Sequence, residues 1–307
     1  MRKEKGSCKI RLEYALFSGM ISLVKLAPAR ALRLQQRLLA FFMQKGSPRH
    51  SRLISHNLSL AFPAASPAWR ADLKKRIYSH FSRMFVEIAR VFARHETGSI
   101  LEHARTANLE VLERALEKGR GVIIFSAHFG NWEWIPLILR QRLGREIHIV
   151  ARPMDNPLIE NRVREFRTAM GSQVIYKQGS LRTILKRLAA NGIVVLLIDQ
   201  NTVPREGVFV DFFARQAATI TTVSQLYLKK NIPLVPAFLH YEAEAIVLEV
   251  LPEVDFTAGD ARPDAVTGLT QELTRRIEEQ VRRFPEQWFW FHDRWKTRPQ
   301  GEPHASQ

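Results

Sequence analysis

The sequence predicts an α/β fold with a mixed central sheet flanked by helices, preceded by N-terminal membrane-associated helices. Short apolar runs of strand length alternate with segments of helical periodicity from residue 121 onward. The chain has 307 residues, 46% of them hydrophobic, which is enough to bury a large core. Residues 1–50 carry eleven Lys and Arg against two acidic residues, so +9 of the net charge of +16 lies in the first sixth of the chain.

The N-terminal segment combines apolar and basic residues. Residues 14–24 (YALFSGMISLV) carry no charge, but they fall short of the roughly 20 residues that a helix needs to span a bilayer. In residues 31–43, leucine and phenylalanine are mixed with Arg33 and Arg37. We therefore expect two basic amphipathic helices within residues 10–44 that lie in the membrane interface. A secretory signal peptide, a tilted single span and an ordinary docked helical hairpin are the alternatives.

The region before the sheet, residues 51–118, is predicted to be mostly helical. Apolar residues recur at helical spacing from Leu73 to Val91, with Lys and Arg between them. The run that begins at Leu109 repeats this pattern, and Gly119 is a natural C-terminal stop for it. These apolar stripes are expected to face the core.

The sheet is predicted from short apolar runs that alternate with helical patterns, an order typical of a sheet with helices on both faces. No internal repeat, low-complexity region or interior linker divides this part of the chain, so we expect an anchor over 1–44 and one catalytic domain over 45–307. The predicted strands are 121–127, 147–151, 173–176, 193–198, 234–240 and 245–251, and the predicted helices among and after them are 158–170, 181–190 and 267–284.

Charge and cysteine content narrow the class of function. The single cysteine, Cys8, excludes an internal disulfide and a zinc site built from cysteines, and favours a reducing compartment. The net charge of +16 favours an anionic partner, which is a nucleic acid, an anionic membrane surface or an acidic protein. The sequence shows no base-stacking module or helix-turn-helix pattern, so we do not expect nucleic acid as the partner.

The strongest local signal is the segment 126–133 (SAHFGNWE), at the end of a predicted buried strand. Sites in open α/β sheets form at the carboxyl ends of strands. On one straight helix His128 and Glu133 would point in different directions, but Gly130 and Asn131 favour a turn that can bring them together. A carboxylate beside an imidazole fixes its tautomer, as a general base for an alcohol requires.

Other chemistries fit this segment less well. A zinc hydrolase would need the His-Glu-x-x-His spacing, and a hydrolase with a serine nucleophile at Ser126 would need Gly-x-Ser-x-Gly. On spacing alone, a purely structural histidine remains an equal alternative.

Further along the chain, three blocks follow this motif in a fixed order. His-x4-Glu after a buried strand resembles the His-x4-Asp/Glu motif of glycerolipid-type acyltransferases. The later blocks narrow the resemblance to the late lipid A biosynthesis acyltransferases, the lauroyl and myristoyl transferases. These blocks are 152–159 (RPMDNPLI), Asp199 with 207–213 (GVFVDFF) and 217–219 (AAT), and 285–299 (PEQWFWFHDRWKTRP).

The resemblance implies a glycerolipid-acyltransferase-like fold and a set of catalytic residues. His128 would be the general base on an acceptor hydroxyl, and Glu133 would orient it. Arg167 and Asp199 stand at positions that are functionally important in the family. Their structural alternatives are a solvated arginine-rich helix face, on which Arg164 could replace Arg167, and a loop cap for Asp199.

Four further residues are predicted to bind the substrate. For Asn131, Arg152 and Asn156 the alternative is a loop or turn-forming role, because Asn156 precedes a proline. The predicted substrate-binding residues are Asn131, Arg152, Asn156 and Arg164.

The family also implies the partners and the place of the reaction. The donor would be an acyl thioester on acyl carrier protein, and the acceptor would be an anionic glycolipid, a lipid A precursor. The reaction would run at the cytoplasmic face of the inner membrane, with no metal and no other cofactor. An acceptor of another kind (another glycolipid, an aminolipid or a lysophospholipid) is the alternative within enzymes. A non-catalytic basic protein that binds membranes or nucleic acid is the alternative from another class.

Overall fold

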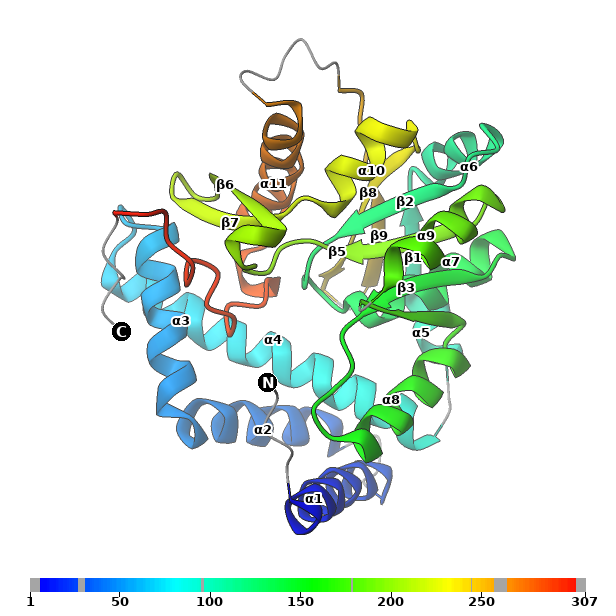
Figure 1. Cartoon of the computed structure of the whole chain (residues 1–307). Coiled ribbons are helices and arrows are strands. Elements are labelled where there is room, and N and C mark those ends of the chain that lie inside the picture. Colours follow the sequence, from blue (N-terminus) through cyan, green and yellow to red (C-terminus); the bar gives the residue numbers. More distant parts are fainter. Residues whose placement is uncertain are drawn as a thin grey trace.

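The computed structural model describes residues 6–26, 31–94, 97–177, 179–243, 245–256 and 264–301 (Figure 1). At the centre of these residues lies a seven-stranded sheet in the order β1-β9-β8-β2-β5-β3-β4, with β8 and β9 antiparallel and the other pairs parallel. This confirms the predicted mixed central sheet. Its strands are β1 (Ala104–Ala107), β2 (Val122–Ser126), β3 (Ile147–Ala151), β4 (Ser172–Tyr176), β5 (Ile193–Leu197), β8 (Leu234–Glu242) and β9 (Ala245–Val250).

Two apolar clusters form the core, one on each face of the sheet. Because successive side chains of a strand point to opposite faces, Ile123 and Phe125 of β2 belong to one cluster and Val122 and Ile124 to the other. The first cluster packs under α3 (Pro48–Ala61), α9 (Ser180–Ala189), α10 (Thr222–Lys230) and α11 (Ala265–Arg283), and the second under α5 (Gly98–His103), α6 (Leu109–Glu117), α7 (Ile135–Leu143) and α8 (Pro157–Ala169), while α4 (Pro67–Arg94) contributes to both.

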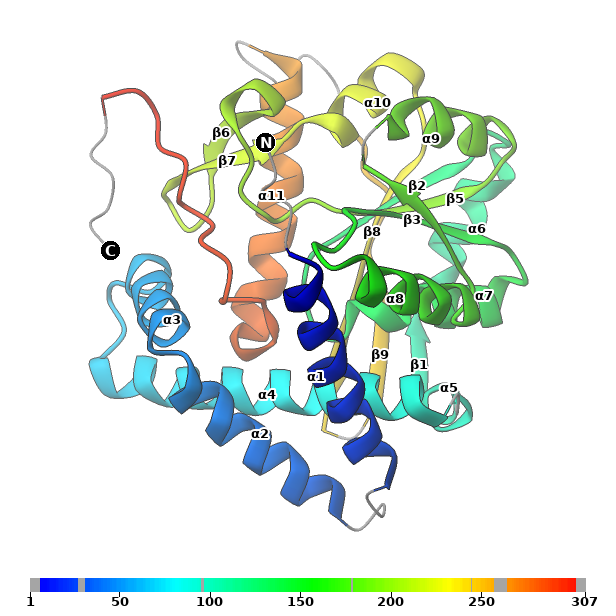
Figure 2. The same ribbon diagram turned by 60° about the horizontal axis from the view of Figure 1, so that its bottom comes forward.

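The N-terminal segment forms two helices, α1 (Ser7–Leu26) and α2 (Leu32–Gly46), as expected. Both lie against α4, and α1 also reaches α8 (Figure 2). The ring of Phe17 meets that of Phe92 edge-on at a centroid distance of 5.6 Å. Among the residues that the model describes, no helix has the length and apolar character needed to cross a membrane.

Several elements, among them one strand of the central sheet, were not predicted. β1 lies inside the segment expected to be helical; its four residues have little strand propensity and form an edge strand because they pair with β9. The antiparallel hairpin of β6 (Gly207–Asp211) and β7 (Gln216–Ile220) and the helix α10 complete the fold between β5 and β8.

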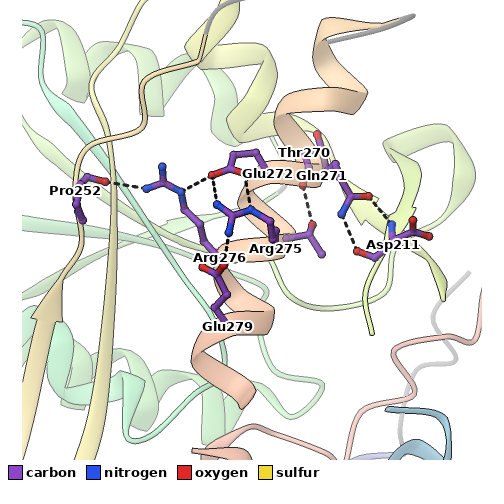
Figure 3. A network of polar contacts seen from close by, with 9 residues as sticks. Asp211, Pro252, Thr270, Gln271, Glu272, Arg275, Arg276 and Glu279 are labelled. Carbon is purple, nitrogen blue, oxygen red and sulfur yellow. Dashed lines mark hydrogen bonds and ion pairs between the residues drawn. The ribbon is translucent and has the colours of Figure 1, made fainter. Parts of the chain in front are cut away.

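Helix α11 holds the hairpin in place through the side chain of Gln271 (Figure 3). The amide of Gln271 spans the backbone of Asp211, accepting from its N–H at 2.6 Å and donating to its carbonyl at 3.0 Å. On the other side of the helix Arg276 donates to the Pro252 carbonyl at 2.9 Å and contacts Glu272 at 2.8 Å. The hairpin is therefore fixed to α11, and α11 to the segment after β9.

Candidate active site

The imidazole of His128 is flanked by Asp199 and Gln200, two consecutive residues of another loop. His128 follows β2, and Asp199 and Gln200 follow β5; because these strands are parallel neighbours, their carboxyl ends meet at one edge of the sheet. Nδ1 of His128 is 2.8 Å from Oδ1 of Asp199, and Nε2 is 3.3 Å from the amide nitrogen of Gln200. An ionised carboxylate only accepts hydrogen bonds, so Nδ1 carries the proton of the neutral ring. Nε2 is then unprotonated and carries the lone pair that a general base requires.

The carboxylate of Asp199 is buried, with 2% of its side chain exposed. Besides the imidazole, its Oδ2 accepts from the backbone N–H of His128 at 3.0 Å and from the indole N–H of Trp288 at 2.9 Å. Burial alone would raise the pKa of Asp199, but the facing His128 ring and these hydrogen bonds hold this pKa below its ordinary value. Asp199 is therefore ionised at neutral pH and oriented at both oxygens.

Glu133 has a different partner from the one expected. Its carboxylate forms a two-pronged pair with the guanidinium of Arg167, with contacts of 2.6 and 3.1 Å, while Nδ1 of His128 is bonded to Asp199. The prediction that Glu133 directly orients His128 is therefore wrong in this geometry. Burial would raise the pKa of Glu133, but Arg167 and, more weakly, His128 lower it. Glu133 acts on the imidazole through its charge and on Arg167 by direct contact.

A cavity of about 930 Å³ opens at the exposed side of His128. Its lining is mixed. Apolar side chains come mainly from α9, α10 and the end of β5, and within the described residues six cationic side chains and two carboxylates line the same cavity. The apolar lining includes Leu181, Ile184, Leu185, Ile198, Val223 and Leu226, and the charged lining is Arg152, Arg167, Lys177, Arg205, Lys229, Lys230, Glu133 and Glu206.

Of the four predicted substrate-binding residues, only Arg152 lines this cavity. Asn131 is fully buried and donates to the Tyr241 hydroxyl at 3.2 Å. Asn156 caps the N-terminus of α8, and its amide donates to the carbonyl of Ile10 in α1 at 2.9 Å. The structural alternative thus holds for both asparagines.

The arginines of α8 separate in the same way. Arg164 is exposed and lies 3.5 Å from Asn161, whereas the side chain of Arg167 is only 19% exposed and faces the site. Of these two arginines, Arg167 is therefore the one that contacts Glu133 in the catalytic loop, residues 128–133.

Two residues at the site were not predicted as functional, Gln200 and Trp288. Gln200 follows Asp199 directly, so its place at the end of β5 could have been a signal. Trp288 is buried, and its indole N–H bonds to Asp199. Only the folded chain shows this second role, because 89 residues separate the two.

The C-terminal segment and α4 clamp the loop between His128 and Glu133. The backbone N–H of Gly130 donates to the Gln287 carbonyl at 2.8 Å, and the Gly130 carbonyl lies 3.3 Å from Nε2 of His80. The N–H of Phe289 donates to the His128 carbonyl at 2.9 Å. The backbone on both sides of the catalytic loop is thus fixed by residues that are distant in sequence.

Gly130→Ala is expected to destabilise the protein by about 3–5 kcal/mol. Gly130 has a φ of +59°, and a Cβ there would lie 1.8 Å from the carbonyl oxygen of Leu239. Gly144 has a similar φ of +64° but open space around it, so Gly144→Ala is the matched control and should cost only about 1–2 kcal/mol. Chemical denaturation of the two variants measures both values; equal losses would contradict the steric argument.

The free energy of unfolding is expected to decrease as the pH is lowered, because His80 is buried in its neutral form. Burial, and then Arg83, lower the pKa of His80 from 6.5 to about 4 against the opposing hydrogen bond to Gly130. Because the unfolded chain binds this proton near pH 6.5 and the folded chain only near pH 4, acidification favours unfolding. The loss is roughly 3 kcal/mol between pH 7 and pH 4.

Denaturation of the wild type and of His80→Gln across this pH range measures the effect. The carboxylates of Asp199 and Glu133, whose pKa values are also lowered, add a loss of the same sign that is common to both proteins. The variant should therefore show a shallower decline, and parallel declines would contradict the assignment to His80.

Comparison with known proteins places this site in a family. The family model described as bacterial lipid A biosynthesis acyltransferase matches residues 4–297. The lipid A biosynthesis lauroyltransferase of Escherichia coli K12 is 27% identical over 268 residues, which are 83% of this chain and 82% of that protein. The myristoyltransferase of the same organism is 25% identical over 263 residues, 83% of this chain and 77% of the relative.

A relative that acts on another lipid is similar to the same degree. The phosphatidylinositol mannoside acyltransferase of Mycolicibacterium smegmatis is 26% identical over 228 residues, which are 73% of this chain and 72% of that protein. The family that the sequence motifs predict is confirmed, and with it the enzyme class. The chain belongs to the bacterial lipid A biosynthesis acyltransferase family and is an acyltransferase.

Proposed function

We propose that this protein transfers a fatty acyl chain from an acyl thioester to a hydroxyl of an anionic glycolipid, with His128 as the general base and Asp199 as the residue that orients it. The observation that carries this proposal is the pair of His128 and Asp199 at the wall of a cavity that both apolar and cationic side chains line. The apolar side chains suit an acyl chain, and the cationic side chains suit an anionic head group.

The reaction follows from the tautomer of His128. Nε2 removes the proton of the acceptor hydroxyl while the oxygen attacks the thioester carbonyl carbon, and Asp199 stabilises the imidazolium that forms. When the tetrahedral intermediate collapses, the carbon–sulfur bond breaks and the imidazolium returns the proton to the leaving thiolate. The products are an ester and a thiol.

A lipid A precursor is our first choice of acceptor, and acyl carrier protein is our first choice of carrier for the donor. The family match and the two Escherichia coli relatives support the acceptor. The net charge of +16 supports an acidic carrier protein. A phosphorylated mannolipid is the second candidate, because the mycobacterial relative is named for such an acceptor.

Transfer assays with purified protein test this choice. Acyl carrier protein and coenzyme A thioesters of 12 to 18 carbons are each offered with a lipid A precursor or a phosphatidylinositol mannoside. We expect the carrier-protein thioester and the lipid A precursor to give the fastest transfer. Mass spectrometry of lipids from a strain that lacks the protein checks the acceptor independently, because the missing mass identifies both the acceptor and the chain.

We further propose that α1 and α2 rest on the inner membrane at its cytoplasmic face. Leu12, Leu16 and Met20 recur every four residues along α1, and all three are exposed, Leu16 by 67%. A similar exposed apolar face on α2 lies next to basic residues. It consists of Leu34, Leu38, Phe41 and Phe42, beside Arg33 and Arg37.

The variant Phe41→Glu/Phe42→Glu is expected to reduce binding to vesicles of phosphatidylethanolamine and phosphatidylglycerol at least about tenfold. Two exposed rings leave the interface and two negative charges face anionic lipid. Sedimentation with vesicles measures the change, and Val203→Glu, at an exposed valine outside these helices, is the control. Undiminished sedimentation of the double variant would contradict this orientation.

A further inference from the structure

The amide of Gln200 lies at the nitrogen of His128 that takes part in the reaction. We propose that Gln200 is a catalytic residue whose side-chain N–H donates a hydrogen bond to the oxyanion of the tetrahedral intermediate; this rests on the acyl transfer proposed above. Its amide nitrogen is 3.3 Å from Nε2 of His128, and the residue lines the cavity. Since Nδ1 of the neutral ring donates to Asp199, Nε2 accepts, and only the NH₂ end of the amide fits beside it.

Several donors next to His128 are engaged with other partners in the described residues. The N–H groups of His128, Phe129 and Gly130 bond to Asp199, Ala127 and Gln287, respectively. The guanidinium of Arg167 is held in a two-pronged pair by Glu133.

The residue after Gln200 is engaged as well. The side chain of Asn201 donates to the Thr297 hydroxyl at 3.0 Å and accepts from the Thr297 N–H at 3.1 Å. The amide of Gln200, by contrast, touches the reacting nitrogen itself, so it is placed to exchange this partner for the oxyanion during the reaction.

The amide of Gln200 exchanges its hydrogen-bond partner as negative charge develops on the carbonyl oxygen of the thioester. The acceptor hydroxyl binds within about 3 Å of Nε2 and takes the place of the amide there. As the hydroxyl oxygen bonds to the thioester carbon, the carbonyl π electrons move onto the carbonyl oxygen, and the N–H of Gln200 donates to this charge. When the carbonyl reforms and the thiolate leaves, the hydrogen bond weakens again. Stabilisation that is strongest in the transition state raises kcat.

The test compares Gln200→Ala, the equal-sized Gln200→Glu and the wild type in acyl transfer, with the thioester and acceptor pair that the assays above select. For Gln200→Ala we expect kcat to fall about 10²–10³-fold, with KM for both substrates within about threefold and with the acid limb of the kcat–pH profile in place. Gln200→Glu should lose at least as much, since a carboxylate would face the oxyanion. Gln173→Ala, at an exposed glutamine on β4, is the control.

Other outcomes overturn the inference. A kcat within tenfold of the wild type in either variant shows that Gln200 does not stabilise the transition state. A rise in KM alone assigns Gln200 to acceptor binding, and a shifted acid limb assigns it to positioning of His128. His128→Ala is assayed in parallel: if it keeps full activity, the proposed function fails, whereas an inactive His128→Ala beside a fully active Gln200→Ala refutes only the role of Gln200.

Discussion

Replacement of His128 by alanine is expected to lower kcat for acyl transfer by about 10³–10⁴-fold. The imidazole is the group that faces the cavity with an accepting nitrogen, and its removal leaves the acceptor hydroxyl without a base. Steady-state assays of thiol release and of lipid product measure the loss.

The fold should survive this replacement. Asp199 keeps its hydrogen bonds from the backbone N–H of residue 128 and from the Trp288 indole, so its buried carboxylate still has hydrogen-bond donors. Circular dichroism and thermal melting check this, and His56→Ala, at a half-buried histidine of α3, controls for histidine loss elsewhere. A folded His128→Ala enzyme with wild-type turnover would refute the proposed chemistry.

Asp199→Asn is expected to lower kcat by about 10³–10⁴-fold while the protein stays folded. The carboxylate accepts the Nδ1 proton and stabilises the imidazolium; an amide carries no charge, and its NH₂ group favours the tautomer in which Nδ1 accepts. Nε2 would then carry the proton and could not take one from the acceptor.

The matched variant Glu133→Gln distinguishes the role of the Glu133 carboxylate from that of Asp199. It also lowers the rate, but through Arg167, so the tautomer of His128 should not change. Nuclear magnetic resonance of ¹⁵N-labelled histidine reads the tautomer directly. We expect Nδ1–H in the wild type and in Glu133→Gln, and its loss in Asp199→Asn. The reverse pattern would return the orienting role to Glu133.

Much of the fold was predictable because buried strands leave a local signal. Six of the seven strands of the central sheet contain short apolar stretches, and each lies where the sequence predicts it. β1 has no such signal, since its residues Ala104–Ala107 pair with β9 only after the chain has folded. The hairpin β6–β7 is similarly held by α11, which follows it by more than 40 residues.

The site was predictable in its residues but not in their pairing. His128 and Glu133 are close in sequence, which suggested a direct contact, but the turn at Gly130 sends Glu133 toward Arg167. Asp199 is 71 residues from His128, and their contact follows from the order of the strands. Strand order is set by packing of the whole sheet, which local patterns do not encode.

The clamp around the catalytic loop has a consequence for biosynthesis of the enzyme. Gln287, Trp288 and Phe289 are translated about 90 to 160 residues after the groups they secure. A nascent chain whose C-terminal segment is still inside the ribosome exit tunnel therefore has its histidine without this support. Catalytic competence therefore arises only after residues 287–289 have left the tunnel, well after α1 and α2 have emerged.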